Sequence, residues 1–261
     1  MTTSILRPGT FIGVLAAESR SELLKALRLP AFLVPTLVFP AMFYALFGLM
    51  LNRDALAGGV AMPAYLLASY GTFGVVGAAL FGMGIGVAAE RGQGWLTLKR
   101  ATPMPPLAYF LAKVMLSIMV GATIAVLIAA LGAVFGGVRL SSGAWLLLFA
   151  TLTLGTIPFC AFGCALGYLA GPSSAPMIAN LIYLPMSIAS GLWIPIEYLP
   201  DALQAIAPLL PPYHLARLAL APIRGEATGA LVHVGALVLA TAAFLTAAVL
   251  AYRRDDGRTW G

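Results

Sequence analysis

Charged residues are scarce in this 261-residue chain: Lys, Arg, Asp and Glu make up 9% of it, whereas hydrophobic residues make up 61%. In soluble domains roughly a quarter of all residues are charged, so the composition predicts an integral membrane protein. A helix that spans a bilayer needs ~20 apolar residues, and the chain has room for about six of them. We therefore expect an all-α integral membrane protein that forms one transmembrane domain over residues 1–261.

The motifs of several protein classes are missing as well. The nine acidic residues fall in loops, tails or the ends of the apolar runs, whereas carriers driven by ion gradients usually place an ionisable group at mid-membrane. The chain has no G-x-x-x-x-G-K-[S/T], H-E-x-x-H or G-x-S-x-G motif, so we expect neither an ATPase nor a hydrolase. If ATP drives this protein, the ATPase is a separate chain, and no cofactor or metal is expected here.

Cysteine and histidine offer little for a reactive site. The two cysteines, Cys160 and Cys164, lie one helical turn apart in an apolar run and are expected to pack rather than to bind metal. His233 lies near the end of the last apolar run, where a packing or interfacial role is expected.

Apolar runs, separated by proline- and glycine-rich breaks, place the helices. The run from Leu140 to Ile196 carries no charge and would be roughly 85 Å long as one helix, so it must fold back. Its best break is the Gly171-Pro172-Ser173-Ser174 segment. The predicted transmembrane helices cover residues 29–51, 62–89, 107–135, 144–170, 174–193 and 230–252. Gly82 and Gly86 in the second of them form a small-xxx-small pair that permits close helix approach.

Two further regions are expected to lie at the membrane surfaces. Residues 10–28 form an amphipathic helix with Glu18, Glu22 and Lys25 on one face, either lying in the interface or standing as a solvated segment. Prolines divide residues 195–222 into short outer helices or a re-entrant hairpin. Eleven of the fifteen Lys and Arg residues fall on the side of the N-terminus, so both termini are expected in the cytoplasm. Orientation, rather than nucleic-acid binding, accounts for the net charge of +6.

A short charged segment, residues 90–103, interrupts the apolar sequence on the expected cytoplasmic side. Trp95 and Leu98 are three residues apart and form an apolar knob, with Lys99 and Arg100 beside it. Such a knob suits docking into a groove on a partner protein. The alternative is a positively charged anchor with an interfacial tryptophan.

Two polar stripes mark a candidate pathway through the membrane. Both are spaced by three and four residues, so each lies on one face of its helix. The stripes consist of Tyr65, Ser69 and Thr72 in the second helix, and Asn180, Tyr183 and Ser187 in the fifth. Hydrogen bonding between packed helices explains the pattern equally well.

Two sequence patterns resemble a known family. The first contains Glu90-Arg91, Gly94-Trp95-Leu96, Lys99-Arg100 and Thr102-Pro103, and resembles the coupling segment of type-2 ABC exporter permeases. The second runs from Ser190 to Pro200 and on to Pro211-Pro212-Tyr213-His214, and is similar to the loop before the last helix of the same family. The drug- and antibiotic-exporting branch is the most similar.

This resemblance implies an ATP-driven exporter of the bacterial inner membrane. Two permease subunits would pair, as a homodimer or heterodimer, and each would dock on an ATPase subunit that binds ATP and Mg. The docking segment would contain Glu90, Arg91, Gly94, Trp95, Leu98, Lys99 and Arg100. The first, second and fifth helices would line the route of an amphipathic or hydrophobic small molecule. Polysaccharide or sodium exporters of the same family remain alternatives, as does a self-powered channel or carrier.

Overall fold

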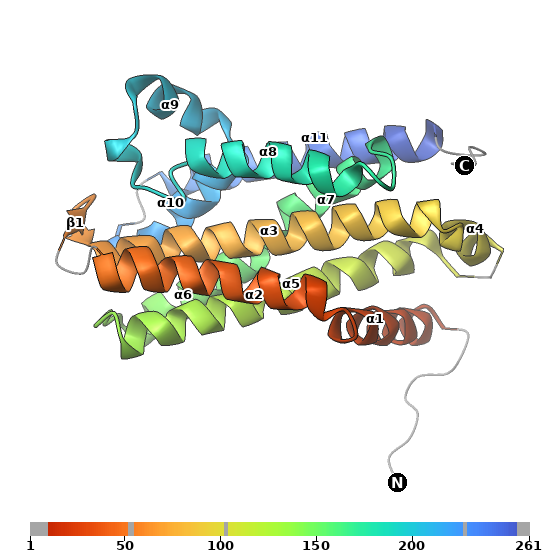
Figure 1. The fold of residues 1–261 in the computed structure, drawn as a ribbon, viewed down its shortest axis with the longest axis horizontal. Helices are drawn as coiled ribbons and strands as arrows, with labels where there is room; N and C mark the ends of the chain where they lie inside the picture. The colour runs from red at the N-terminus through yellow and green to blue at the C-terminus, as the bar shows by residue number, and fades with distance from the viewer. Residues whose placement is uncertain (1–9, 52–54, 102–103, 227–228, 255–261) are drawn as a thin grey trace, which may run out of the picture.

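The computed structural model describes residues 10–51, 55–101, 104–226 and 229–254, and only the backbone of Thr97 and Arg100. The long helices run along one axis (Figure 1). The N-terminal helix and a short helix that contains Trp95 lie at one end of this bundle, which we call the α4 end. A two-stranded hairpin and the short helices after residue 195 lie at the other, which we call the β1 end.

The helices follow one another with short connections. In chain order the elements are α1 (Phe11–Leu27), α2 (Pro30–Phe43), η1 (Tyr44–Leu51), β1 (Leu56–Ala57), β2 (Val60–Ala61), α3 (Met62–Gly92), α4 (Trp95–Arg100), α5 (Pro106–Val134), α6 (Ser142–Leu154), α7 (Thr156–Leu169), α8 (Ala175–Ala189), η2 (Ile196–Tyr198), α9 (Asp201–Ile206), η3 (Ala207–Leu209), α10 (Pro211–Arg224) and α11 (Ala230–Arg254). The two strands pair antiparallel, with Leu56 opposite Ala61.

Within the described residues, five helical stretches are long and apolar enough to cross a bilayer: Pro30–Leu51, α3, α5, Ser142–Leu169 and α11. The all-α membrane fold is therefore confirmed. The sixth apolar helix, α8, has 15 residues and ends four residues before the predicted boundary at 193. Gly191, in the left-handed conformation at φ 74°, turns the chain there.

Prolines shape two of the spans from within. Pro158 has no N–H to donate to the carbonyl of Leu154, and the span breaks into α6 and α7 just there, at Gly155. The span that begins at Pro30 contains Pro35 and Pro40, and after Phe43 it continues as the wider π-helical turns of η1. All three prolines therefore change their helix without ending the span, as membrane helices allow.

Helix α3 forms the centre of the bundle: 72% of its most apolar stretch is buried, against 17% for α11. Helix α3 approaches α7 most closely at glycine residues of the two helices. A Cβ on Gly167 would stand 2.7 Å from the carbonyl oxygen of Gly84, and one on Gly163 would stand 3.0 Å from that of Leu80. Gly82 and Gly86, the pair predicted from the sequence, do not face α7. A Cβ on Gly82 would meet Phe32, and one on Gly86 would meet Lys113. The small-residue contact thus exists, but at Gly84, two residues away from either member of the predicted pair.

Candidate functional site

The short helix α4 presents two large apolar side chains to the outside. Gly94 has a φ of 73°, which lets the chain turn between α3 and α4. Trp95 is 49% exposed and Leu98 is 65% exposed. The opposite side of α4 is anchored, because Leu96 packs over Tyr109 and Tyr168, next to Phe110 and Tyr252. The knob predicted from the sequence therefore projects from a fixed base.

Beneath α4, ionised side chains from four helices meet in one cluster, which we call the charge cluster. Three are carboxylates and three are ammonium groups, so their charges balance. The members are Glu18, Glu22 and Lys25 of α1, Glu90 of α3, Lys99 of α4 and Lys113 of α5. Buried charges are tolerated when they are paired in this way.

Glu90 stands at the centre of the charge cluster. Its Oε1 accepts hydrogen bonds from Lys25 Nζ at 2.9 Å and Lys113 Nζ at 3.1 Å, and its Oε2 accepts one from the Tyr109 hydroxyl at 2.6 Å. Lys99 pairs with Glu18 and lies over the Tyr109 ring at 4.4 Å. Since Lys99 belongs to α4 and Glu18 to α1, these contacts tie the two helices together.

Helix α1 turns its polar face toward the bundle. Glu22 is 4% exposed and pairs with Lys25 at 2.7 Å and with Lys113 at 2.8 Å. Burial lowers the pKa of Lys25, but hydrogen bonds and attraction from Glu22 and Glu90 outweigh it and raise that pKa to about 12. The apolar residues Ile12 and Leu27 are exposed instead, at 66% and 58%. The charged face of α1, which the sequence defined without its surroundings, thus lies against protein.

Arg91 joins the end of α3 to the end of α7. Its Nη1 donates to the carbonyl oxygens of Gly167 at 2.5 Å and Ala170 at 3.2 Å, and its guanidinium lies 5.3 Å from the centre of the Tyr168 ring. A cation at the C-terminus of a helix satisfies free carbonyls and opposes the helix dipole. Arg91 is 8% exposed, and these contacts are with its own chain, whereas its predicted role in docking stays a prediction. Of Arg100, only the backbone position is described.

The predicted stripe on α3 lies inside the bundle. Tyr65, Ser69 and Thr72 are 3%, 1% and 0% exposed. The Tyr65 hydroxyl accepts from the Ile196 amide at 3.5 Å, whereas the hydroxyls of Ser69 and Thr72 have no hydrogen-bond partner among the described residues. The pathway role of this stripe stays a prediction.

The predicted stripe on α8 borders a cavity of about 450 Å³ between α2, α3 and α8. Asn180 and Tyr183 line it, while Ser187 is buried and accepts from Trp193 Nε1 at 2.9 Å. The Tyr183 hydroxyl donates to the Phe73 carbonyl at 2.6 Å. Aromatic rings form much of the wall: Phe32, Phe39, Phe43, Phe73, Phe81, Tyr183 and Trp193. The structure thus brings together the α8 stripe and the first span, but not the α3 stripe.

Known proteins match most of this chain. The family model described as "ABC-2 type transporter" matches residues 15–223. The chain belongs to the ABC-2 type transporter family. It is also 30% identical over 214 residues to the protein named "Putative transport permease YvfS" of Bacillus subtilis (strain 168), which covers 82% of this chain and 87% of that protein. The chain is therefore a permease subunit of an ABC transporter.

Sequence reasoning missed two features of this ABC-2 permease. His233 has a partner, because its Nδ1 lies 2.8 Å from Nδ1 of His214, whose Nε2 lies 2.9 Å from the Pro208 carbonyl. His214 stood in the second family-like pattern, but no spacing rule joins it to His233. The charge cluster was also missed. The i,i+3 pair of Glu22 and Lys25 was visible, but nothing in the sequence joined it to Glu90 and Lys113.

Proposed function

We propose that this ABC-2 permease is the membrane subunit of an ATP-driven exporter, moved by a separate ATPase subunit that docks on α4. One observation carries the proposal: Trp95 and Leu98 are exposed on a helix whose inner side is fixed to the bundle. Exposed aromatic and aliphatic anchors are typical of the centre of a protein interface. The ATPase, and not this chain, would bind ATP and Mg.

Movement of α4 would reach the membrane helices through two links. Lys99 connects α4 to Glu18 of α1 and to the Tyr109 ring of α5. Glu90 and Arg91, at the end of α3, connect that helix to α1, α5 and α7. A push on Trp95 and Leu98 would thus displace several helices together, because their ends form one ionic unit.

The orientation of the chain follows from its basic residues. Lys25, Arg91, Lys99 and Lys113 lie at the α4 end, and the last turn of α11 adds Arg253 and Arg254. By the positive-inside rule, this distribution supports a cytoplasmic location for this end, where ATP is available. We propose that the protein resides in the inner membrane of a bacterium with both termini inside.

The cavity between α2, α3 and α8 is the proposed cargo site. Its volume of about 450 Å³ lies within the range of ~300–1,000 Å³ typical of small-molecule sites. Its aromatic wall and the amide of Asn180 suit an amphipathic or hydrophobic small molecule. A second permease subunit, identical or related, would complete the route along α2 and α8, whose outward side chains Met42, Met177 and Leu181 are 45%, 70% and 72% exposed.

Docking is tested by the double substitution W95D/L98D in the permease coexpressed with its ATPase. We expect export of a fluorescent amphipathic dye into inverted vesicles to fall to background and stimulation of ATP hydrolysis to disappear. Membrane insertion and thermal unfolding should stay unchanged, because both side chains are exposed. Leu209→Asp is the matched control: Leu209 is 79% exposed at the β1 end. Normal dye export by the double variant would refute docking on α4.

The cargo site needs its own test. Asn180→Leu and Ile188→Leu both lie on α8, and Asn180 lines the cavity whereas Ile188 does not. We expect only the first to change the concentration dependence of dye export, with ATPase docking intact. Equal behaviour of the two variants would place the route elsewhere while leaving the docking proposal standing.

A further inference from the structure

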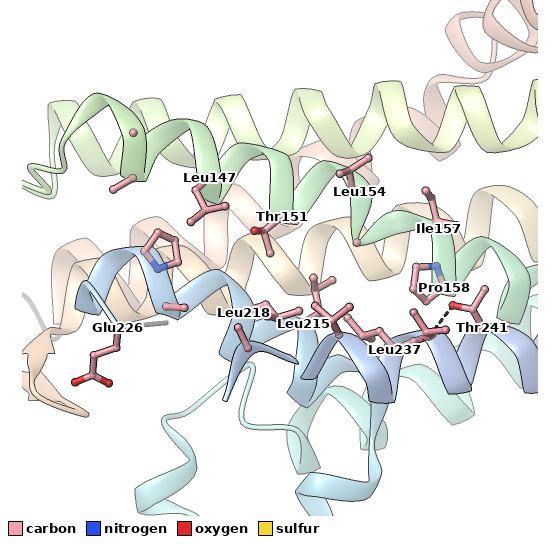
Figure 2. A pocket seen from close by; sticks show the side chains of 18 of the residues that line it. Leu147, Thr151, Leu154, Ile157, Pro158, Leu215, Leu218, Glu226, Leu237 and Thr241 are labelled. Carbon is pink, nitrogen blue, oxygen red and sulfur yellow. Dashed lines mark hydrogen bonds between the residues drawn. The ribbon is translucent and has the colours of Figure 1, made fainter. Parts of the chain in front are cut away.

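A long apolar groove runs between α6, α7, α10 and α11, away from the proposed cargo cavity. Its volume is about 1050 Å³. Figure 2 shows Leu147, Thr151 and Leu154 along one side, Leu215, Leu218 and Leu237 along the other, and Glu226 at one end. The side chains that line it are aliphatic except for Ser141, Thr151, Glu226 and Thr241. The Thr241 hydroxyl is satisfied within its own helix by the Leu237 carbonyl at 2.7 Å.

The groove has the direction and length of a lipid chain. Helix α11 lines it from Ala230 to Leu245, which is about 22 Å at ~1.5 Å per residue. A bilayer has a hydrocarbon core of ~30 Å, and α11 is one of the helices long enough to span it. An occupant of the groove therefore lies parallel to the acyl chains of the membrane. The aliphatic wall fits such a chain and offers almost no hydrogen bonds to a polar ligand.

At the β1 end the groove meets a second, polar cavity of about 200 Å³. Leu218, Ala221, Glu226 and Ala230 line both cavities, so the two adjoin each other. The polar cavity adds Arg217, Arg224, Tyr213 and His233. Among the residues that line it, two arginines stand against one carboxylate, that of Glu226, and the Glu197 carboxylate lies near Arg224 beside Gly58. Basic pockets between membrane helices on the cytoplasmic side of membranes bind the headgroups of anionic lipids, and the same chemistry is available to arginines at the β1 end.

The two arginines are placed to act together. They are seven residues apart on α10, so they lie two turns apart on one face. Arg217 Nε donates to the Tyr213 hydroxyl at 3.2 Å, and its guanidinium lies 5.5 Å from the centre of that ring, which fixes the side chain. Arg224 Nε is buried and has no hydrogen-bond partner among the described residues. A buried guanidinium N–H without an acceptor is costly, and a phosphate oxygen would supply one.

We propose that this chain binds one glycerophospholipid, with its phosphate on Arg217 and Arg224 and an acyl chain in the groove between α6 and α11. Arginine forms bidentate hydrogen bonds to phosphate, so two arginines hold the headgroup against the aqueous phase. Glu226 borders both cavities and sets the outer limit of the headgroup. The site uses none of the residues that line the cavity between α2, α3 and α8, and it does not depend on the direction of transport.

The headgroup is tested by titrating the purified, delipidated chain in detergent with palmitoyl-oleoyl phosphatidylglycerol and with the diacylglycerol of the same chains, and counting bound lipid by native mass spectrometry. We expect one saturable site that prefers the phosphate-bearing lipid about tenfold or more. In R217Q/R224Q this preference should vanish, whereas it should persist in the control Arg139→Gln, which alters an exposed arginine near the β1 end. Equal binding of both lipids to the unaltered chain would overturn the proposal, as would an undiminished preference in the double variant.

The groove is tested separately. Leu147→Trp places an indole in it, whereas Leu146→Trp, on the neighbouring residue, adds the same side chain outside; the two leucines are 55% and 69% exposed. We expect the first variant to weaken phosphatidylglycerol binding at least about tenfold and the second to leave it unchanged. Equal binding by both variants would show that no chain occupies the groove. Inorganic phosphate that binds as tightly as the lipid would likewise overturn the role of the acyl chain.

Discussion

The two ends of the bundle differ in how their charged side chains are paired. At the α4 end, Glu90 and its neighbours pair across four helices. At the β1 end, Arg217 bonds to a tyrosine hydroxyl, and Arg224 Nε has no partner among the described residues. Burial of a charge costs several kcal/mol unless a partner compensates for it. The charges at the α4 end are therefore compensated within the chain, whereas Arg224 at the β1 end keeps an N–H for which the described residues offer no acceptor.

Substitution of Glu90 should destabilise the α4 end, and its expected effect on the free energy of unfolding is the largest. Glu90→Ala leaves Lys113, which is 4% exposed, and Lys25 with one carboxylate fewer. We expect a loss of about 3–5 kcal/mol in the free energy of unfolding, because uncompensated buried charge is costly. Urea or thermal unfolding in detergent measures it. Glu226→Ala at the β1 end is the control, with an expected change below about 0.5 kcal/mol, since Glu226 is exposed. A loss as small as that of the control for Glu90→Ala would show that the charge cluster does not stabilise the fold.

The contact of α3 with α7 at the α4 end should be the next most sensitive. A Cβ on Gly167 would stand 2.7 Å from the Gly84 carbonyl and 2.9 Å from Val87 Cβ, so Gly167→Leu must push the helices apart. We expect a cost of about 1–3 kcal/mol, typical of overpacking, measured by thermal unfolding. Gly235→Leu is the control, because a Cβ on Gly235 meets nothing within 4 Å. Similar melting of the two variants would contradict close packing at Gly167.

The sequence predicted where the helices begin and end better than it predicted which segments contact one another. Apolar run lengths and breaks such as Gly171–Ser174 place the helices within a few residues, since a bilayer imposes length directly. The rotation of α1 was not predictable in this way. Periodicity shows that Glu18, Glu22 and Lys25 share a face, but not whether that face meets water or other charges. In a lipid environment the apolar face faces outward, so the polar face packs on Glu90 and Lys113.

Contacts between distant segments were also beyond the sequence. The choice of Gly82 and Gly86 over Gly84 shows the problem, because small residues are abundant in α3 and only the partner helix selects a register. His214 and His233 meet because the short helix α10 packs beside α11, which no spacing in either helix encodes. The knob of Trp95 and Leu98 was predictable, since α4 is local and its exposure follows from its own pattern.

The histidine pair tests how much a partly buried contact at the β1 end contributes to the free energy of unfolding. His214→Ala removes the contacts to His233 Nδ1 and to the Pro208 carbonyl. We expect a loss of about 1 kcal/mol in unfolding free energy, the usual net worth of a neutral hydrogen bond, and less than for Glu90→Ala. A double-mutant cycle with His233→Ala isolates the pair, and a coupling energy near zero would show that the two imidazoles do not support each other.

The smallest expected change in stability is at the exposed side chains of α4. It tests whether these side chains serve docking or stabilise the fold. Trp95→Ser and Leu98→Ser alter side chains that are 49% and 65% exposed, so each should shift the unfolding free energy by less than about 0.5 kcal/mol. Leu96→Ser, on the buried side of the same helix, should cost more, because Leu96 packs over Tyr109 and Tyr168. Thermal unfolding compares the three variants. If Trp95→Ser destabilised the isolated chain as much as Leu96→Ser, the exposed knob would be part of the fold, and the ATPase would have to grip the α4 end elsewhere.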